Sequence, residues 1–324
     1  MNLKRATIIY NPVSGRPGRR AENVRVMVGL LAERDIQVQA FATTGPQDAS
    51  LKASNAVADN VDVVISYGGD GTLNEVIQGM AGSGTALAVW PGGTANVAAR
   101  DLAIPSDITR LADMIAAGKT RRVALGVAVG VGGWGLGAGN KRSERQPPTA
   151  NPQPTPNPQP LRRYFLMMAG IGIDASIARG VNKSLKRFVG QLAYWWCGIK
   201  HIFLWRAELF SIDVDGRLFE SAFALIGKGK GYGGGMTMTP GAKLEEPLFE
   251  VFILPPLRNN FAYLRAVTAC KNGTPQAAGA TLIKGKHIRA NSSVEPWVHV
   301  DGEVIGPLPM SFEVAPDALS LIVP

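Results

Sequence analysis

The chain has 324 residues, and 46% of them are hydrophobic, which is enough for two domains with apolar cores and excludes a disordered protein. The net charge of +9 favours anionic partners such as nucleotides or anionic lipids. The two cysteines exclude a disulfide framework and are typical of a reducing cytosol. A membrane-spanning helix needs roughly 20 apolar residues without charge, and the best window, 185–205, contains Lys186, Arg187 and Lys200.

The first 125 residues alternate between strand and helix patterns. The opening apolar stretch, 6–10, is predicted to be a first strand and not a signal peptide. Alternating strands and helices predict an α/β N-terminal domain with a parallel sheet. Further strands are predicted at 36–43, 61–66 and 86–90, and helices at 21–34, 48–58 and 72–80.

Residues 126–161 are predicted to be a disordered insertion of about 35 residues, because a glycine-rich stretch leads into a tract of Pro, Asn and Gln that cannot build a core. The glycines at 130, 132 and 135 match the pattern of a dinucleotide-binding loop. That match is discounted, because a proline tract follows it where a helix is required.

Residues 162–324 have a different pattern, with short strands separated by turns such as Asp215-Gly216. The pattern predicts a mostly antiparallel β-rich second domain, interrupted by one helix from Ser184 to about Trp205. An alternative for the final segment of the chain is that it returns to the first domain.

The segment Gly68–Thr72, with the sequence GGDGT, follows a predicted buried strand and leads into a helix. Bare backbone N–H groups there, together with the helix N-terminus, suit a phosphate. Thr72 and Glu75 have the spacing of a capping box that would mark the helix start. Asp70 suggests Mg²⁺ or a proton acceptor, because a carboxylate repels phosphate unless a cation lies between them. The alternative is a tight turn with a helix cap.

Two further loops of similar composition follow predicted strands, Asn11–Gly15 (NPVSG) and Pro91–Asn96 (PGGTAN). Parallel strands end at one edge of their sheet, so three such loops would converge on one crevice. Convergence favours a nucleotide site over three independent turns.

Near the end of the chain, a strand pattern would place His299, Asp301 and Glu303 on one face. Two carboxylates so close together tend to raise the pKa of one of them, which suits a general base. The alternative is an ordinary hairpin with a turn at Asp301-Gly302.

Five motifs, NPVSG, GGDGTLNEV, PGGTANVAAR, AGIGIDA and VDGE, occur in the order found in the bacterial diacylglycerol and lipid kinase family. The chain resembles that family, which includes sphingosine, ceramide and phosphatidylglycerol-type lipid kinases, over nearly its whole length except 126–160. The loop GGDGT alone is also similar to loops of NAD kinases and phosphofructokinases, so the ordered set carries the resemblance.

The resemblance implies a two-domain, ATP- and Mg²⁺-dependent kinase with its nucleotide site in the cleft between the domains. Glu303 would accept the proton of a lipid hydroxyl, with Asp301 beside it and Asp70 holding Mg²⁺·ATP. Thr43 matches the family's nucleotide-contacting threonine, and Thr94 would contact the phosphates. The nucleotide-binding residues that the resemblance implies are Asn11, Pro12, Val13, Ser14, Gly15, Thr43, Gly68, Gly69, Asp70, Gly71, Thr72, Asn74, Glu75, Gly93, Thr94 and Asn96.

Relatives often carry a structural Mg²⁺ site in a Lys-Leu-Asp-Asp-Gly pattern. This chain has KLEEPL, in which the corresponding ligands are Lys243, Glu246 and Leu248. Glu lengthens the ligand arm and Pro247 replaces a flexible Gly, whereas Mg²⁺ demands tight octahedral geometry. We therefore expect the site to be empty.

Between Ala175 and Ala207 there are six basic residues and no acidic one, together with Trp195, Trp196 and other aromatic residues. This combination suits the surface of an anionic membrane, and the alternative is a helix packed on the second domain's sheet.

Taken together, these features predict a cytoplasmic, peripherally membrane-associated lipid kinase that acts on diacylglycerol or a related lipid. A homodimer is compatible with this prediction. The alternatives are an NAD kinase-like enzyme or an inactive nucleotide- or lipid-binding regulator. No nucleic-acid partner is expected, because no nucleic-acid-binding motif is present.

Overall fold

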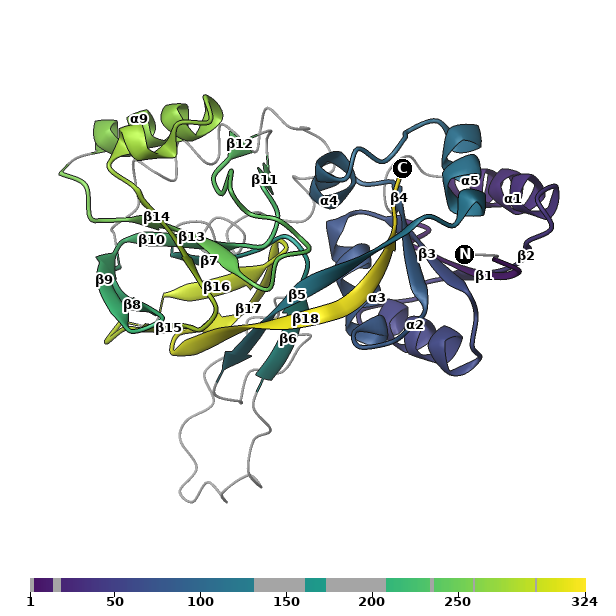
Figure 1. Cartoon of the computed structure of the whole chain (residues 1–324), viewed down its shortest axis with the longest axis horizontal. Coiled ribbons are helices and arrows are strands. Elements are labelled where there is room, and N and C mark those ends of the chain that lie inside the picture. The colour runs from purple at the N-terminus through teal and green to yellow at the C-terminus, as the bar shows by residue number, and fades with distance from the viewer. Residues whose placement is uncertain are drawn as a thin grey trace, which may run out of the picture.

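The computed structural model describes residues 3–13, 19–130, 161–172, 208–233, 236–258, 260–294 and 296–324. The predicted α/β domain followed by an antiparallel β domain is confirmed (Figure 1). Ser14, Gly15 and the predicted helix from Ser184 to Trp205 lie outside the described residues.

The N-terminal domain contains four parallel strands in the order β2-β1-β3-β4. Helices α1 and α5 lie on one face of this sheet and α2 and α3 on the other (Figure 1). The elements are β1 (Arg5–Tyr10), α1 (Arg19–Ala32), β2 (Gln37–Ala42), α2 (Asp48–Ala58), β3 (Val63–Gly68), α3 (Asp70–Met80), β4 (Ala86–Pro91), α4 (Val97–Asp101) and α5 (Ile108–Ala117).

Burial of side chains explains these layers. Strand β3 is covered on both faces, and every residue of it is buried, as expected for a central parallel strand. Helix α2 buries only alanines, Ala49, Ala53 and Ala56, one turn apart, so α3 can approach it closely. A Cβ on Gly79 of α3 would lie 2.2 Å from the carbonyl oxygen of Ser50, which shows how close the two helices are.

The second domain is a sandwich of two sheets around an apolar core. One sheet has the order β14-β13-β10-β7-β16-β17, and the other contains β9, β8, β15, β18, β5 and β6. Their facing side chains, such as Phe165, Phe249 and Phe312, are fully buried between the sheets. The strands are β5 (Thr120–Gly130), β6 (Leu161–Phe165), β7 (Met168–Gly172), β8 (Phe210–Val214), β9 (Arg217–Ser221), β10 (Phe223–Gly227), β13 (Phe249–Leu254), β14 (Thr281–Gly285), β15 (Ile288–Asn291), β16 (Trp297–Val300), β17 (Glu303–Pro307) and β18 (Met310–Ile322).

The final strand joins the two domains into one ten-stranded sheet. The C-terminal part of β18 pairs with β4, the N-terminal part pairs with β15, and β5 runs antiparallel along it. Figure 1 shows β18 in yellow passing from the sandwich to the N-terminal sheet. The last segment of the chain thus returns to the first domain.

The structure differs from the sequence-based predictions for this region in two ways. Residues 126–130 do not begin an insertion, because they complete β5 and pair with β6, which starts at Leu161. The second domain also has a helix that the strand patterns did not predict, α9 (Asn260–Lys271). Tyr263, Ala266 and Cys270 on its buried side have helical spacing, so the signal was present in the sequence.

The remaining short elements lie near α9: β11 (Gly231–Tyr232) pairs with β12 (Met236–Thr237), and Pro275–Ala278 forms a 3-10 helix. Within the described ranges, every helix is too short or too polar to cross a bilayer.

Candidate active site

The four parallel strands of the N-terminal domain end together, and the predicted nucleotide-binding loops begin there. Tyr10, at the end of β1, is flanked in register by Ala42 and Tyr67. The backbone N–H of Thr43 donates to the Tyr10 carbonyl at 2.8 Å, and that of Asn11 donates to the Tyr67 carbonyl at 3.3 Å. The loops after β1, β2, β3 and β4 therefore lie at one edge of the sheet.

The loops after β3 and β4 touch through their backbones. The N–H of Gly92 donates to the Gly68 carbonyl at 2.8 Å. A Cβ on Gly93 would lie 2.6 Å from the Cα of Gly69, so only glycine allows this approach. Asn96, at a φ of 47°, closes the second loop by two 2.8 Å hydrogen bonds between its amide and the backbone of Gly93.

Helix α3 starts at Asp70, directly after this contact, and not at Thr72. The predicted capping box is wrong, because Gly69 is the N-cap and no side chain caps the helix. The Cβ of Thr72 would lie 2.5 Å from a Cβ on Gly68, so Thr72 packs back against the strand end. The N–H groups of Asp70, Gly71 and Thr72 have no carbonyl four residues earlier within the helix, and such groups suit an anion.

Asp70 ties the two glycine loops together. Its Oδ1 accepts a hydrogen bond of 2.8 Å from the backbone N–H of Val97, at the start of α4, and the N–H of Asn96 also donates to the carboxylate. Burial raises the pKa of Asp70, and these hydrogen bonds oppose the rise. Asp70, Gly68, Gly69, Pro91 and Asn96 all line a small pocket at the strand ends.

The loop that carries Thr43 is held by two carboxylates. Asp48 accepts hydrogen bonds from the N–H of Thr44 at 2.7 Å and from its hydroxyl at 3.0 Å, and it pairs with Lys52 at 2.5 Å. Glu75, on α3, accepts from the N–H groups of Gln47 and Ala49 at the start of α2. Burial raises the pKa of Glu75, and the negative charge of Glu303 adds to the rise.

The carboxylates at the C-terminal end of the sequence lie on a hairpin and not on one strand face. Asp301 and Gly302 form the two-residue turn between β16 and β17, with φ angles of 47° and 84°. The carboxylate of Asp301 accepts from the backbone N–H groups of Leu166, Met167 and Met168 at 2.9–3.0 Å and from Asn74 Nδ2 at 3.1 Å. With both of its oxygens occupied, Asp301 anchors the hairpin.

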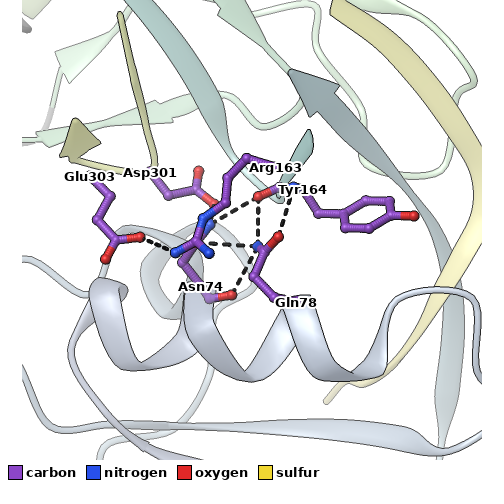
Figure 2. A network of polar contacts seen from close by, with 6 residues as sticks. All are labelled: Asn74, Gln78, Arg163, Tyr164, Asp301 and Glu303. Atoms are coloured by element: carbon purple, nitrogen blue, oxygen red, sulfur yellow. Dashed lines mark hydrogen bonds and ion pairs between the residues drawn. The ribbon is translucent and has the colours of Figure 1, made fainter. Parts of the chain in front are cut away.

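Helix α3, which starts at the glycine loops, also contacts this hairpin and β6 through Asn74 and Gln78, as Figure 2 shows for the two side chains. Asn74 Nδ2 donates to Asp301 and also to the carbonyl of Tyr164 at 3.1 Å. One turn further, the amide of Gln78 forms hydrogen bonds of 2.9 Å with both the N–H and the carbonyl of Tyr164. Asn74 lies about 6 Å along the helix axis from Asp70, so the anion site and the hairpin are neighbours.

Glu303, the first residue of β17, pairs with the buried guanidinium of Arg163. Arg163 Nη2 lies 2.6 Å from Glu303 Oε2, and the side chains are 8% and 39% exposed (Figure 2). Glu303 is therefore a carboxylate that reaches solvent and is held on one side by a buried cation.

The structure brings most of the predicted residues together, but not all. Asn11, Thr43, the segment Gly68–Glu75, Gly93 and Asn96 share the strand edge with the hairpin close by, and Thr94 is exposed there between Gly93 and Asn96. The predicted Mg²⁺ ligands Lys243, Glu246 and Leu248 lie in a separate loop before β13. In the part of the chain that the structure describes, no three His, Cys, Asp or Glu side chains gather in a way that could hold a metal.

Comparison with known proteins identifies the family. The model of the diacylglycerol kinase catalytic domain matches residues 5–128, and the model of the YegS C-terminal NAD kinase beta sandwich-like domain matches residues 168–323. Diacylglycerol kinases of Staphylococcus aureus strains bovine RF122 / ET3-1 and MRSA252 are each 30% identical over 315 residues, covering 95% of this chain and 89% of theirs. The chain belongs to the diacylglycerol kinase family.

A crystal structure of a diacylglycerol kinase from Bacillus anthracis str. Sterne has the same fold, with a TM-score of 0.74 at 22% identity over 100% of this chain and 98% of that one. Family membership makes this protein a diacylglycerol kinase-like lipid kinase, a phosphotransferase, as the resemblance implied. The relatives support neither the NAD kinase-like alternative nor the inactive regulator.

Sequence reasoning missed Arg163, Gln78 and the buried residue Arg20. The Arg20 guanidinium lies 4.1 Å from the ring centre of Tyr67, which stacks on Trp90, and it donates to the Gly92 carbonyl. Gln78 has a detectable signal, since it lies one turn after Asn74 on a helix face. Arg162 and Arg163 are indistinguishable in the sequence, because only the register of β6 decides that Arg163 is buried.

Proposed function

We propose that the protein transfers the γ-phosphate of ATP to the hydroxyl of diacylglycerol or a related lipid, in a Mg²⁺-dependent reaction at a cytoplasmic anionic membrane surface. The observation that carries this proposal is the linkage through α3: its N-terminus lies at the glycine loops, and its next turn holds the hairpin that bears Glu303. Phosphate and acceptor hydroxyl would then meet between them.

The nucleotide part rests on the strand edge. Backbone N–H groups at the start of α3 and in the PGGTAN loop suit phosphate oxygens, and Thr94 is exposed beside them. Mg²⁺ is usually held by one or two carboxylates together with substrate phosphates, and Asp70 is the carboxylate at this position. When bound, Mg²⁺ would neutralise charge on the phosphates.

The acceptor part rests on Glu303. Its carboxylate would take the proton of the lipid hydroxyl while the hydroxyl oxygen attacks the γ-phosphorus and the bond to the β-phosphate oxygen breaks, releasing ADP. The ion pair with Arg163, at 2.6 Å, holds the carboxylate in one position for this contact.

The membrane part rests on charge. Residues 255–294, which include α9, contain six basic residues and no acidic one, and Phe261 at the start of α9 is 71% exposed. Arg258, Arg265 and Lys271, on or beside α9, are exposed, and basic residues next to an exposed aromatic ring suit an anionic bilayer. The basic, tryptophan-rich segment 175–207 has the same character, but it lies outside the described residues.

A transfer assay tests the proposal directly. Purified protein is incubated with Mg²⁺ and γ-labelled ATP, with diacylglycerol in mixed micelles containing anionic lipid or, separately, with NAD⁺. We expect label in the organic phase, and mass spectrometry of the product identifies the acceptor. Label on NAD⁺ alone would favour the NAD kinase-like alternative, and ATP binding without any transfer would favour a regulator.

The role of Glu303 has its own test. We expect Glu303→Gln to lower kcat roughly a hundredfold or more, because the amide cannot accept the proton, while the dissociation constant for ATP stays within about twofold. Glu313→Gln, at a surface position on β18, is the control and should retain wild-type turnover. Near-wild-type kcat for Glu303→Gln would remove Glu303 from the base role.

A further inference from the structure

A buried lysine, Lys228, directly follows β10 and is fully shielded from solvent. Its ammonium donates to the backbone carbonyl oxygens of Lys243 at 3.2 Å, Leu248 at 3.1 Å and Glu246. A buried charge is unfavourable unless it is compensated, and here three carbonyls match the three N–H donors of the ammonium.

The three carbonyls belong to the same three residues that the family resemblance nominates as ligands of a structural Mg²⁺. The carboxylate of Glu246 is not turned to this point, because its oxygens pair with Lys243 Nζ and Lys284 Nζ, each at 2.9 Å, near the surface. Mg²⁺ requires six oxygens at about 2.1 Å in an octahedron, whereas an ammonium is satisfied by three acceptors near 3 Å. The residues present fit the ammonium and do not fit Mg²⁺.

We infer that the Lys228 ammonium is the built-in cation of the loop 243–248, where it takes the place of a divalent ion, so this loop needs no metal. The inference rests on the contacts of Lys228 and does not depend on the reaction proposed above.

The lysine also connects this loop to the hairpin. The backbone N–H groups of Lys228 and Gly229 donate to the Met167 carbonyl at 2.8 and 3.0 Å. The N–H of Met167 in turn donates to Asp301 Oδ1 at 3.0 Å. A cation that fixes the loop therefore supports the turn before Glu303, and loss of the cation is expected to loosen it.

Thermal unfolding without nucleotide provides the first test. We expect Lys228→Met to lower the Tm by about 5 °C or more, because three backbone carbonyls lose their buried donor. Lys230→Met, an exposed position two residues later, is the matched control and should leave the Tm unchanged. Equal Tm values for the two variants would overturn the inference.

The cation character is tested by chemical rescue. Lys228→Ala leaves a space in which methylammonium can present N–H donors to the carbonyls, whereas tetramethylammonium cannot. We expect methylammonium alone to recover part of the lost Tm. No recovery, or equal recovery with both ions, would mean that Lys228 acts only by packing.

The third test uses the folded wild-type protein, so it holds even if the Lys228 variants fail to fold. Mn²⁺ binding is measured by electron paramagnetic resonance on wild type and on Glu246→Gln, without nucleotide. We expect equal binding by the two proteins. Loss of one bound Mn²⁺ in Glu246→Gln would show that the loop holds a metal, and the inference would be overturned.

Discussion

At the scale of single residues, the site depends on a buried cation that no motif contains. The Arg163 side chain is 8% exposed, and the ion pair with Glu303 offsets part of its cost of burial. A buried, planar guanidinium fixes the position of a carboxylate better than water would, because its own side chain has little freedom to move. We therefore regard Arg163 as a positioning residue for Glu303.

We expect Arg163→Met to lower kcat by about ten- to a hundredfold, because small displacements of a reacting group are costly. The KM for ATP should change less than about twofold, since Arg163 is not among the strand-edge loops. Arg162→Met, the exposed neighbour on the same strand, is the control and should keep wild-type kinetics. If both variants gave the same kcat, Arg163 would have no positioning role.

The sequence predicts a site residue where a short motif contains it. It does not predict a residue whose role depends on contacts between distant parts of the chain. Glu303 and Asp70 stand in short motifs, and the structure puts Asp70 at the start of α3 and Glu303 near Glu75 of the same helix. The anchoring role of Asp301, in contrast, depends on backbone N–H groups more than 130 positions away in the sequence. Local spacing cannot reveal such partners.

At the scale of elements, the two glycine loops form one unit, because Gly69 and Gly93 are in backbone contact. We expect Gly93→Ala to weaken ATP binding about tenfold or more and to lower the free energy of unfolding by about 1–3 kcal/mol, because its methyl group meets backbone that cannot move aside. Gly84→Ala, with open space around its Cβ, is the control. Unchanged affinity in Gly93→Ala, measured by calorimetry, would contradict the shared unit.

The start of α2 gives a prediction about pH. The pairing with Lys52, followed by the hydrogen bond from Thr44, holds the pKa of Asp48 below its ordinary value of 3.8. A lowered pKa contributes stability that is complete above the unfolded-state pKa and is lost as pH falls through the folded-state value. Asp48→Asn should therefore cost about 1 kcal/mol at pH 7, and this difference should shrink as the pH falls below 3.8.

The measurement is denaturant unfolding of wild type and Asp48→Asn between pH 7 and pH 2.5. Asp59→Asn, at the other end of the same helix, is the control and should show no such convergence. A difference that is constant over the whole pH range would mean that Asp48 does not act through its charge.

Element types were predictable where the hydrophobic period was strong, and boundaries were not. The alternation of β1, α2 and β3 follows directly from the sequence, because their apolar residues recur at strand or helix spacing. The start of α3 was misplaced by two residues, because Gly69 caps the helix without a side chain. Residues 126–130 were misassigned because glycines masked a strand whose neighbours, β6 and β18, are distant in sequence.

At the scale of the whole molecule, β18 and β5 form a long antiparallel pair that connects the two domains. Leu321 pairs with Leu87 of the N-terminal sheet, while Ile288 of the sandwich pairs with Phe312 at the other end of the same strand. The hairpin bearing Glu303 leads directly into this strand. The strand edge and the hairpin are therefore linked in two ways, by the chain that runs from β17 into β18 and by α3, whose Asn74 contacts Asp301.

The pairing of β5 with β6 predicts that the proline tract can be removed. Gly130, the last residue of β5, pairs with Leu161, the first residue of β6, so the two ends of the intervening segment are already side by side. A shorter connection spans such neighbours without strain, and loop length has only a small effect on closure entropy. We expect deletion of Asn140–Pro160 to change kcat and the KM for ATP by less than about twofold, and the Tm by no more than a few degrees.

The measurement is a transfer assay on the deletion variant beside a second variant in which the same residues are replaced by a Gly/Ser segment of equal length. Wild-type kcat in both would mean that the reaction depends on the joined sheet and not on the tract. A loss of kcat of tenfold or more in both would mean that the tract contributes residues to substrate binding or transfer. A loss in the deletion alone would mean that the length of the connection, and not its composition, holds β5 and β6 in register beside Arg163.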